Sequence, residues 1–190
     1  VWHYGEAQNV NIQDVDLENS YHEYGSVGYL EIAKGHFVAE DNSKVIALVN
    51  TGASNEVKLD KTTKAEVKVA YTENESSNGT GHGGNLELTH KTLTNEEKEE
   101  LIYNAEAQSI NAINVNGKYY KTMSDAFNRV SESGNNSVGY VFDKDVNIVL
   151  YKDIKDMGIQ IKSSKNIVFD LNGHTYTVIS SVGSNGTETN

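Results

Sequence analysis

The sequence contains neither cysteine nor proline, and Arg129 is its only arginine. Without cysteine, the chain cannot form disulfides or use a thiol as a nucleophile or metal ligand. Without proline, its turns depend on its 16 glycines and on asparagine, both of which tolerate the left-handed backbone region. We therefore expect a turn-rich protein whose corners are marked by Gly and Asn.

Positive charge is also scarce, because 16 Lys and Arg face 27 Asp and Glu, which gives a formal net charge of −11. Nucleic acid and anionic membranes both require a positive protein surface, so neither is expected as a partner. No stretch approaches the roughly 20 apolar residues of a membrane span. The length of 190 residues predicts one globular domain or two small ones. Because the chain begins with Val1 and shows no signal peptide, we expect a mature or excised piece of a longer protein.

Residues 1–71 alternate apolar and polar positions in short runs separated by Gly, Asn, Ser and Asp, which predicts β-strands. The expected strands are residues 9–17, 28–40, 44–50, 55–60 and 64–71. Leu30, Leu48 and Val67 recur at a nearly constant interval, which indicates a solenoid of stacked coils. A β-sandwich is the competing interpretation, although its turns would come about every 8–12 residues.

Residues 72–92 are polar and rich in glycine, which is typical of a loop or linker. Leu86 and Leu88 within this range indicate one further strand. A helix is expected over residues 93–110, where Thr94 and Glu97 form a capping box.

Residues 113–120 predict a β-hairpin that turns at Asn116-Gly117. A second helix is expected over residues 122–136, with Thr122 as its N-cap and Gly134 at its end. The β pattern then returns, and the spacing of Ile148 and Ile167 is close to the interval of the first half.

The string Asp170–His174 interrupts the last β run with an Asn172-Gly173 pair. This pair either turns a hairpin between two pairing strands or forms a corner between strands on different faces of one coil. We favour the corner, in which Leu171 would point inward and the Asn172 amide would bond along a ladder of corners.

The order hairpin, short amphipathic helix and β coils resembles the start of right-handed parallel β-helix domains. These domains are pectate-lyase-like in fold and occur in large secreted and cell-surface proteins of bacteria. The residues that carry the resemblance are NGKYYKTMSDAFNRV (116–130), VNIVLYKDI (146–154) and KNIVFDLNGHTYTV (165–178). The resemblance implies a mainly β protein, a right-handed parallel β-helix with short capping and linker helices, that is secreted or held at the cell surface.

The expected domains are β-helix-like coils (1–71), a Gly/Asn/Ser-rich loop (72–92), a helical linker and N-terminal cap (93–136) and the first coils of a β-helix (137–190). An open β-helix end exposes unpaired backbone groups, so head-to-tail self-association is a further hypothesis.

The resemblance also implies how an enzyme on this fold would work, either with an Arg or Lys base beside Ca²⁺-binding carboxylates or with two or three close carboxylates. Arg129 lies on the expected cap helix, which argues against an Arg-based lyase. The acidic candidates, for a metal or for hydrolysis, are the i, i+2 pairs Asp14/Asp16 and Asp143/Asp145. We favour solvated surface acids for both pairs, and predict no catalytic residue, no metal and no cofactor.

Aromatic residues offer a better candidate for binding. We expect a ligand patch near the start of the chain, made by Trp2, Tyr4, Tyr21, Tyr24 and Tyr29. Exposed aromatic rings stack on the apolar faces of sugars, although tyrosine is also common as a strand former. The sequence thus favours a non-catalytic structural or adhesive module that binds a glycan or a host or cell-surface protein. The alternative is a fragment of a carbohydrate-active enzyme, a polysaccharide lyase or glycoside hydrolase.

Overall fold

The computed structural model describes residues 1–15, 19–53, 55–74, 85–131 and 139–180. The chain is mainly β and its sheets are built largely from parallel strands, as expected from the sequence. It divides into two compact units, Val1–Ile110 (unit 1) and Asn111–Asn190 (unit 2). The first helix therefore belongs to unit 1 and the second to unit 2, whereas the sequence analysis grouped both in one helical linker and cap over residues 93–136. None of the helices in the described residues is long and apolar enough to cross a membrane.

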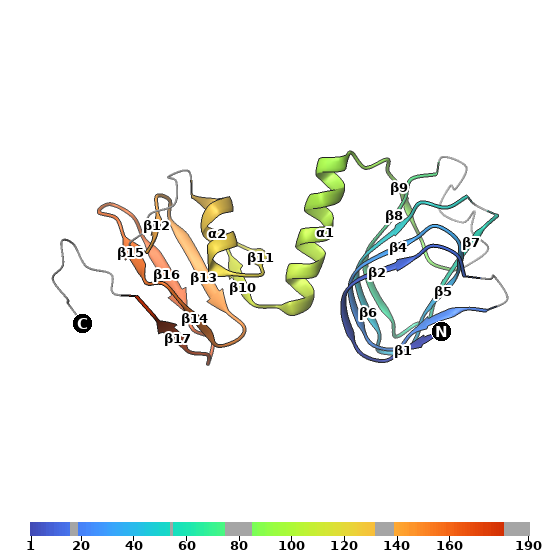
Figure 1. Cartoon of the computed structure of the whole chain (residues 1–190), viewed down its shortest axis with the longest axis horizontal. Helices are drawn as coiled ribbons and strands as arrows, with labels where there is room; N and C mark the ends of the chain where they lie inside the picture. The colour runs from blue at the N-terminus through green and yellow to red at the C-terminus, as the bar shows by residue number, and fades with distance from the viewer. Residues whose placement is uncertain (16–18, 54, 75–84, 132–138, 181–190) are drawn as a thin grey trace. The chain divides into compact units, whose positions relative to one another are not determined.

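In unit 1 the chain passes alternately between two parallel sheets (Figure 1). The strands are β1 (Trp2–His3), β2 (Glu6–Ile12), β3 (Tyr21–Glu23), β4 (Ser26–Ile32), β5 (Gly35–Ala39), β6 (Lys44–Asn50), β7 (Val57–Lys61), β8 (Glu66–Thr72) and β9 (Thr89–His90). One sheet has the order β1-β3-β5-β7 and the other β2-β4-β6-β8-β9. Each strand therefore pairs with the strand that follows about one circuit later, which is the pattern that the regular apolar spacing predicts.

The length of a circuit varies, and this corrects part of the predicted register. Leu30 pairs with Leu48, as expected. Leu48 pairs with Ala70 and not with Val67, because the next circuit is longer than the one before it. The predicted strand 28–40 is also two strands, since the chain leaves one sheet after β4 and enters the other at β5.

The core of unit 1 lies between the two sheets and is formed by the inward apolar residues of each. Leu30 and Ile32 of β4 lie in one cluster with Phe37 of β5 and Leu59 of β7, and each is no more than 1% exposed. Burial of such a side chain contributes roughly 1.5–3 kcal/mol, so the repeated inward positions stabilise the stack. Leu86 and Leu88 are buried in the same cluster, but they do not form the predicted strand; only Thr89–His90 pairs, with β8.

Helix α1 (Asn95–Ile110) covers the outer face of the β2-β4-β6-β8-β9 sheet. Its Ala105 packs against Tyr29, Ala47 and Val49, with Leu101 and Ile102 beside them. The predicted capping box is present: the Glu97 amide donates to Thr94 Oγ1 (3.2 Å), and the Thr94 amide donates to the Glu97 carboxylate (2.9 Å).

Unit 2 begins with the predicted hairpin and continues with parallel pairs. Its elements are β10 (Ile113–Val115), β11 (Lys118–Tyr120), α2 (Met123–Val130), β12 (Tyr140–Phe142), β13 (Val146–Leu150), β14 (Ile154–Asp156), β15 (Ile159–Ile161), β16 (Ile167–Asp170) and β17 (Tyr176–Val178). β12, β13 and β14 pair in parallel with β15, β16 and β17, respectively, so three strands repeat in order. Ile148 pairs with Phe169 rather than with Ile167, because this repeat is longer than the predicted interval.

The predicted hairpin turn and the predicted start of the second helix are confirmed in unit 2, but the helix ends earlier than expected. Asn116 and Gly117 have φ values of 52° and 87° in the turn between the antiparallel strands β10 and β11. Thr122 Oγ1 accepts from the Asp125 amide at the start of α2, which ends at Val130; Gly134 lies outside the described residues. Phe127 anchors α2 on β12, with ring centroids 5.5 Å from Tyr140 and 5.7 Å from Phe142.

Asn172-Gly173 forms a corner and not a hairpin turn. β16 before it pairs with β13, and β17 after it pairs with β14, so the two flanking strands lie in different sheets. Asn172 has a φ of 47°, and its amide Nδ2 donates to the Leu150 carbonyl of the preceding circuit (3.1 Å). The ladder contact is as expected, but Leu171, which was expected to point inward, is 43% exposed and does not belong to the buried core.

Candidate functional site

The outward face of the β1-β3-β5-β7 sheet places aromatic residues of two successive strands side by side. Trp2 of β1 pairs with His22 of β3 in the parallel register. Further along the same two strands, the Tyr24 amide donates to the His3 carbonyl (2.8 Å), which brings Tyr4 and Tyr24 together. Because strand residues at i and i+2 share a face, all four rings lie on one surface.

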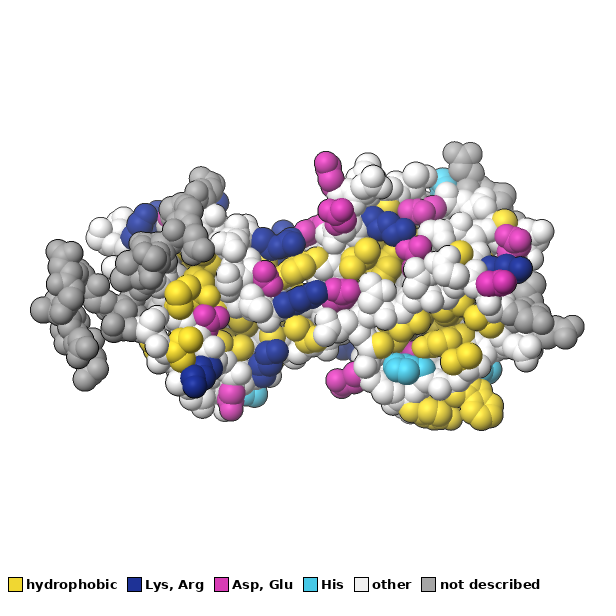
Figure 2. All heavy atoms as spheres, in the orientation of Figure 1, with side chains coloured by type: hydrophobic (Ala, Val, Ile, Leu, Met, Phe, Trp, Pro, Cys, Tyr) yellow, Lys and Arg dark blue, Asp and Glu magenta, His cyan; other side chains and the backbone are white. Residues whose placement is uncertain are grey.

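We call Trp2, Tyr4 and Tyr24 the aromatic platform. Their exposed fractions are 68%, 69% and 38%. The Tyr4 and Tyr24 rings stack with centroids 4.7 Å apart and planes within 13°, and the His22 ring lies nearly parallel to Tyr24 at 6.4 Å. Figure 2 shows hydrophobic side chains gathered beside histidine over the β1 end of unit 1. These flat rings form a solvent-facing row, in which Trp2 lies on β1 while Tyr4 and Tyr24 directly follow β1 and β3.

Tyr21 and Tyr29 do not belong to this surface, although the sequence grouped them with it. Tyr21 is 8% exposed and points into the core, where its ring lies 6.1 Å from Phe37. Tyr29 is 2% exposed and lies under α1. Burial raises the pKa of both hydroxyls, and the neighbouring Glu23 and Glu31 raise it further.

A buried carboxylate fixes the strand that carries the platform. His3, between Trp2 and Tyr4, turns the other way, and its Nδ1 lies 2.9 Å from the carboxylate of Glu23, whose side chain is fully buried. Glu23 also accepts from the Gly25 amide (2.7 Å) and the Tyr21 hydroxyl (3.3 Å). A buried carboxylate is stable only when it is well hydrogen-bonded, so these contacts hold β1 against β3.

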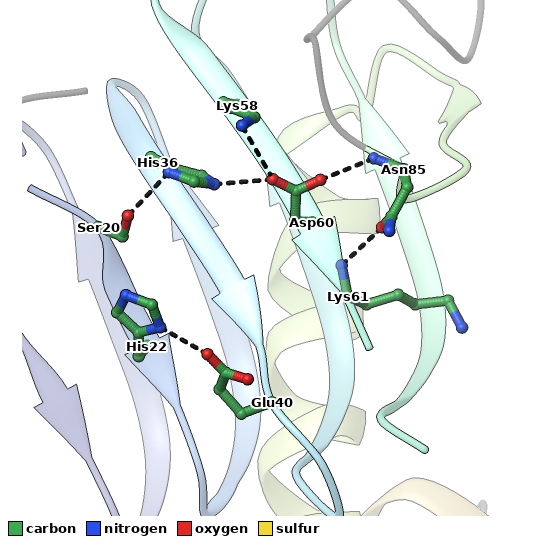
Figure 3. A network of polar contacts seen from close by, with 8 residues as sticks. All are labelled: Ser20, His22, His36, Glu40, Lys58, Asp60, Lys61 and Asn85. Atoms are coloured by element: carbon green, nitrogen blue, oxygen red, sulfur yellow. Dashed lines mark hydrogen bonds and ion pairs between the residues drawn. The ribbon is translucent and has the colours of Figure 1, made fainter. Parts of the chain in front are cut away.

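A polar network continues the same face beyond the platform (Figure 3). His22 Nδ1 lies 2.6 Å from Glu40 Oε1, so the ring beside Tyr24 is tied to a carboxylate on the next strand connection. A second chain of side-chain contacts lies beside this one: Ser20 Oγ lies 2.8 Å from His36 Nδ1, and His36 Nε2 lies 2.8 Å from Asp60 Oδ2. The imidazoles therefore link three neighbouring strands, β3, β5 and β7.

Asp60 is held by several partners in this network. It accepts from the Asn85 amide (3.0 Å) and pairs with Lys58 Nζ (3.4 Å), while Asn85 Oδ1 in turn accepts from the Lys61 amide (2.8 Å). Partial burial alone would raise the pKa of Asp60, but the hydrogen bonds from His36 and Asn85, together with Lys58, lower it below its usual value. The carboxylate is therefore ionised at neutral pH.

The Ser20–His36–Asp60 series has the residue types of a catalytic triad but not its order. In a triad the aspartate bonds to Nδ1 of the histidine, and the serine hydroxyl faces Nε2. Here the serine faces Nδ1 and the aspartate faces Nε2. The arrangement suits a ladder that locks neighbouring strands better than it suits an activated nucleophile.

The acidic pairs do not form the strand-face sites that their spacing suggested. β2 ends at Ile12, so Asp14 lies beyond the strand, where it pairs with Lys34 Nζ at 3.1 Å; Asp16 is outside the described residues. Asp143 and Asp145 lie in the bend between β12 and β13, and Asp145 accepts from the Asn166 amide (2.9 Å). Within the described residues, no three His, Asp or Glu side chains are placed to hold a metal ion.

Comparison with known proteins gives no relative from which a function could be transferred. A scan against protein-family models, a search of curated proteins and a search of solved structures each found no significant match.

Proposed function

We propose that each unit is a short right-handed parallel β-helix and that unit 1 is a glycan-binding, non-catalytic module of a bacterial secreted or cell-surface protein. The order in which the strands return to their sheets supports the architecture: two sheets in unit 1 and three in unit 2 are visited in turn. Parallel strands joined by a crossover are almost always right-handed, because of the right-handed twist of the strands, which supports the handedness.

The observation that carries the function is the aromatic platform. Sugar rings present flat C–H faces, which stack on exposed aromatic rings, while their hydroxyls bond to polar groups at the edge. Trp2, Tyr4 and Tyr24 offer such rings on β1 and directly after β1 and β3, and His22 and Glu40 offer polar groups beside them. The hydrogen bond from the Tyr24 amide to the His3 carbonyl holds the platform backbone in place, which reduces the conformational freedom lost on binding and so favours affinity.

The test is binding to an array of glycans, followed by titration of the glycans that bind. Trp2→Ala and Tyr24→Ala should each weaken binding by about tenfold or more, because each removes one stacking ring. Tyr119→Ala in unit 2 is the control, since it removes one ring of another contacting pair, Tyr119 and Tyr151, at 6.0 Å.

Two results would contradict the proposal. Equal losses for all three variants would show that the platform is not the binding surface. Release of reducing ends or unsaturated products from any bound polymer, at a rate lowered by Asp14→Asn or Asp143→Asn, would show that the module is an enzyme.

A further inference from the structure

We infer that the His22–Glu40 pair makes the aromatic platform selective for neutral, hydroxyl-rich glycans over glycans that carry carboxylate or sulfate groups. The inference rests on the proposed function and adds the chemical class of the ligand. It follows from the hydrogen-bond acceptors and the negative charge that the polar groups beside the platform present to a sugar.

His22 presents a hydrogen-bond acceptor at the platform. Its Nδ1 lies 2.6 Å from a carboxylate oxygen, which can only accept, so Nδ1 carries the hydrogen of this bond. In the neutral tautomer that this contact selects, Nε2 carries the lone pair. The His22 side chain is 28% exposed, beside a Tyr24 ring that is itself open to solvent. A sugar stacked on the rings can therefore donate a hydroxyl hydrogen to His22.

Glu40 lies in the row of residues that continues Tyr4 and Tyr24 across the sheet. Its amide donates to the Glu23 carbonyl (2.9 Å), in the same way as the Tyr24 amide donates to the His3 carbonyl. The carboxylate is 19% exposed and uses one oxygen for His22, so the other oxygen can accept from a ligand. The pKa of the Tyr24 hydroxyl is raised, first by burial, then by the nearby Glu40 and then by Tyr4.

Strand β7 also presents a negatively charged hydrogen-bond acceptor on this face. Asp60 follows His22 and Val38 in register across β3, β5 and β7, and its carboxylate is ionised. Lys58, a cation on the same strand, is engaged by Asp60 at 3.4 Å. A ligand that crosses the sheet from the platform thus meets acceptors and negative charge, which favour hydroxyl and amide N–H donors and repel acidic sugars.

The experiment measures dissociation constants for two kinds of probe with the same protein preparation. Neutral probes are cellohexaose, mannohexaose and chitohexaose; acidic probes are polygalacturonate and heparin oligosaccharides of similar length. For the wild type we expect the best neutral probe to bind at least about tenfold more tightly than either acidic probe. Because selectivity is a ratio within one preparation, it does not depend on the fraction of correctly folded protein.

Glu40→Gln is the informative variant, because an amide keeps an acceptor for His22, removes the charge and adds a donor. We expect it to reduce the neutral-to-acidic ratio by about tenfold. Glu66→Gln is the matched control, since Glu66 is an exposed acid on β8, in the other sheet, and it should leave the ratio unchanged.

The outcomes separate this inference from the proposed function. The selectivity is overturned if the wild type prefers acidic probes, or if Glu40→Gln and Glu66→Gln have the same neutral-to-acidic ratio. In either case, the effect of Trp2→Ala on binding still tests the platform. Absence of binding to every probe and to the glycan array overturns both.

Discussion

At the scale of single residues, the close stacking of neighbouring strand connections leaves no room for a side chain at Gly25. A Cβ at Gly25 would lie 1.9 Å from the Gly5 carbonyl oxygen, a backbone atom that cannot move away without breaking the sheet. Gly25→Ala should therefore lower the free energy of unfolding by roughly 2–3 kcal/mol. Chemical denaturation followed by circular dichroism would measure the change.

Gly5→Ala is the control for this prediction. A Cβ at Gly5 has its nearest neighbour, His3 Nε2, at 3.5 Å, an ordinary contact. The two substitutions add the same atom at stacked positions of adjacent strand connections, so only the space differs. Similar stabilities for the two variants would mean that the two connections are not as closely stacked as described.

The residues of the platform show what the sequence could and could not predict at this scale. The parallel register of β1 and β3 aligns the segment Trp2-His3-Tyr4 with the segment His22-Glu23-Tyr24. That repeat of ring, polar residue, tyrosine is the signal that could have predicted the site, including His22, which was not among the expected site residues. The side to which a lone tyrosine points depends on its register, so the burial of Tyr21 was not predictable from composition.

At the scale of single elements, helix α1 depends on its capping box. Thr94→Ala removes the acceptor of the Glu97 amide and should cost about 1 kcal/mol of unfolding free energy. Glu97 has a lowered pKa, caused first by the Thr94 amide and then by Lys91, so its charge also favours the helix start. Thermal or chemical unfolding of unit 1 would show the loss.

Thr92→Ala is the matched control, because Thr92 is exposed and lies in the non-helical chain that precedes α1. It should change the stability by less than about 0.5 kcal/mol. A Thr94→Ala variant as stable as Thr92→Ala would mean that packing against the sheet, and not the cap, fixes the start of α1.

The elements also explain why some predictions were right and others wrong. Both helices and the Asn116-Gly117 hairpin depend on short-range interactions, such as caps and positive φ angles, so residue types and spacing suffice to predict them. The pairing register of the strands cannot be predicted in this way, because the strand connections differ in length. The circuit that joins Tyr21 to its partner Phe37 is shorter than the one that joins Phe37 to Leu59. A fixed interval thus gives the correct partner only where the connection has the average length.

At the scale of the whole molecule, tyrosines packed inside both units should make the fold sensitive to alkaline pH. Burial is the main cause of the raised pKa of Tyr21, Tyr29, Tyr140 and Tyr176, and nearby carboxylates raise each further; for Tyr140 the pKa reaches about 12. A raised folded-state pKa contributes stability that is fully present below the unfolded value of 10.0 and is lost as the pH rises through the folded value. Stability should therefore decline at alkaline pH, above the ordinary pKa of tyrosine.

An alkaline titration that follows tyrosinate absorbance and circular dichroism together would measure this decline. We expect the exposed tyrosines to ionise first, and the four packed ones only together with loss of the β signal. Tyr140→Phe should flatten the decline because it removes one ionisable group, although it also loses the 2.8 Å bond to Asp156. Ionisation of all tyrosines in one step near the ordinary pKa, with the β signal intact, would contradict the packing of both units, because a ring that is desolvated in the fold cannot ionise as readily as one in water.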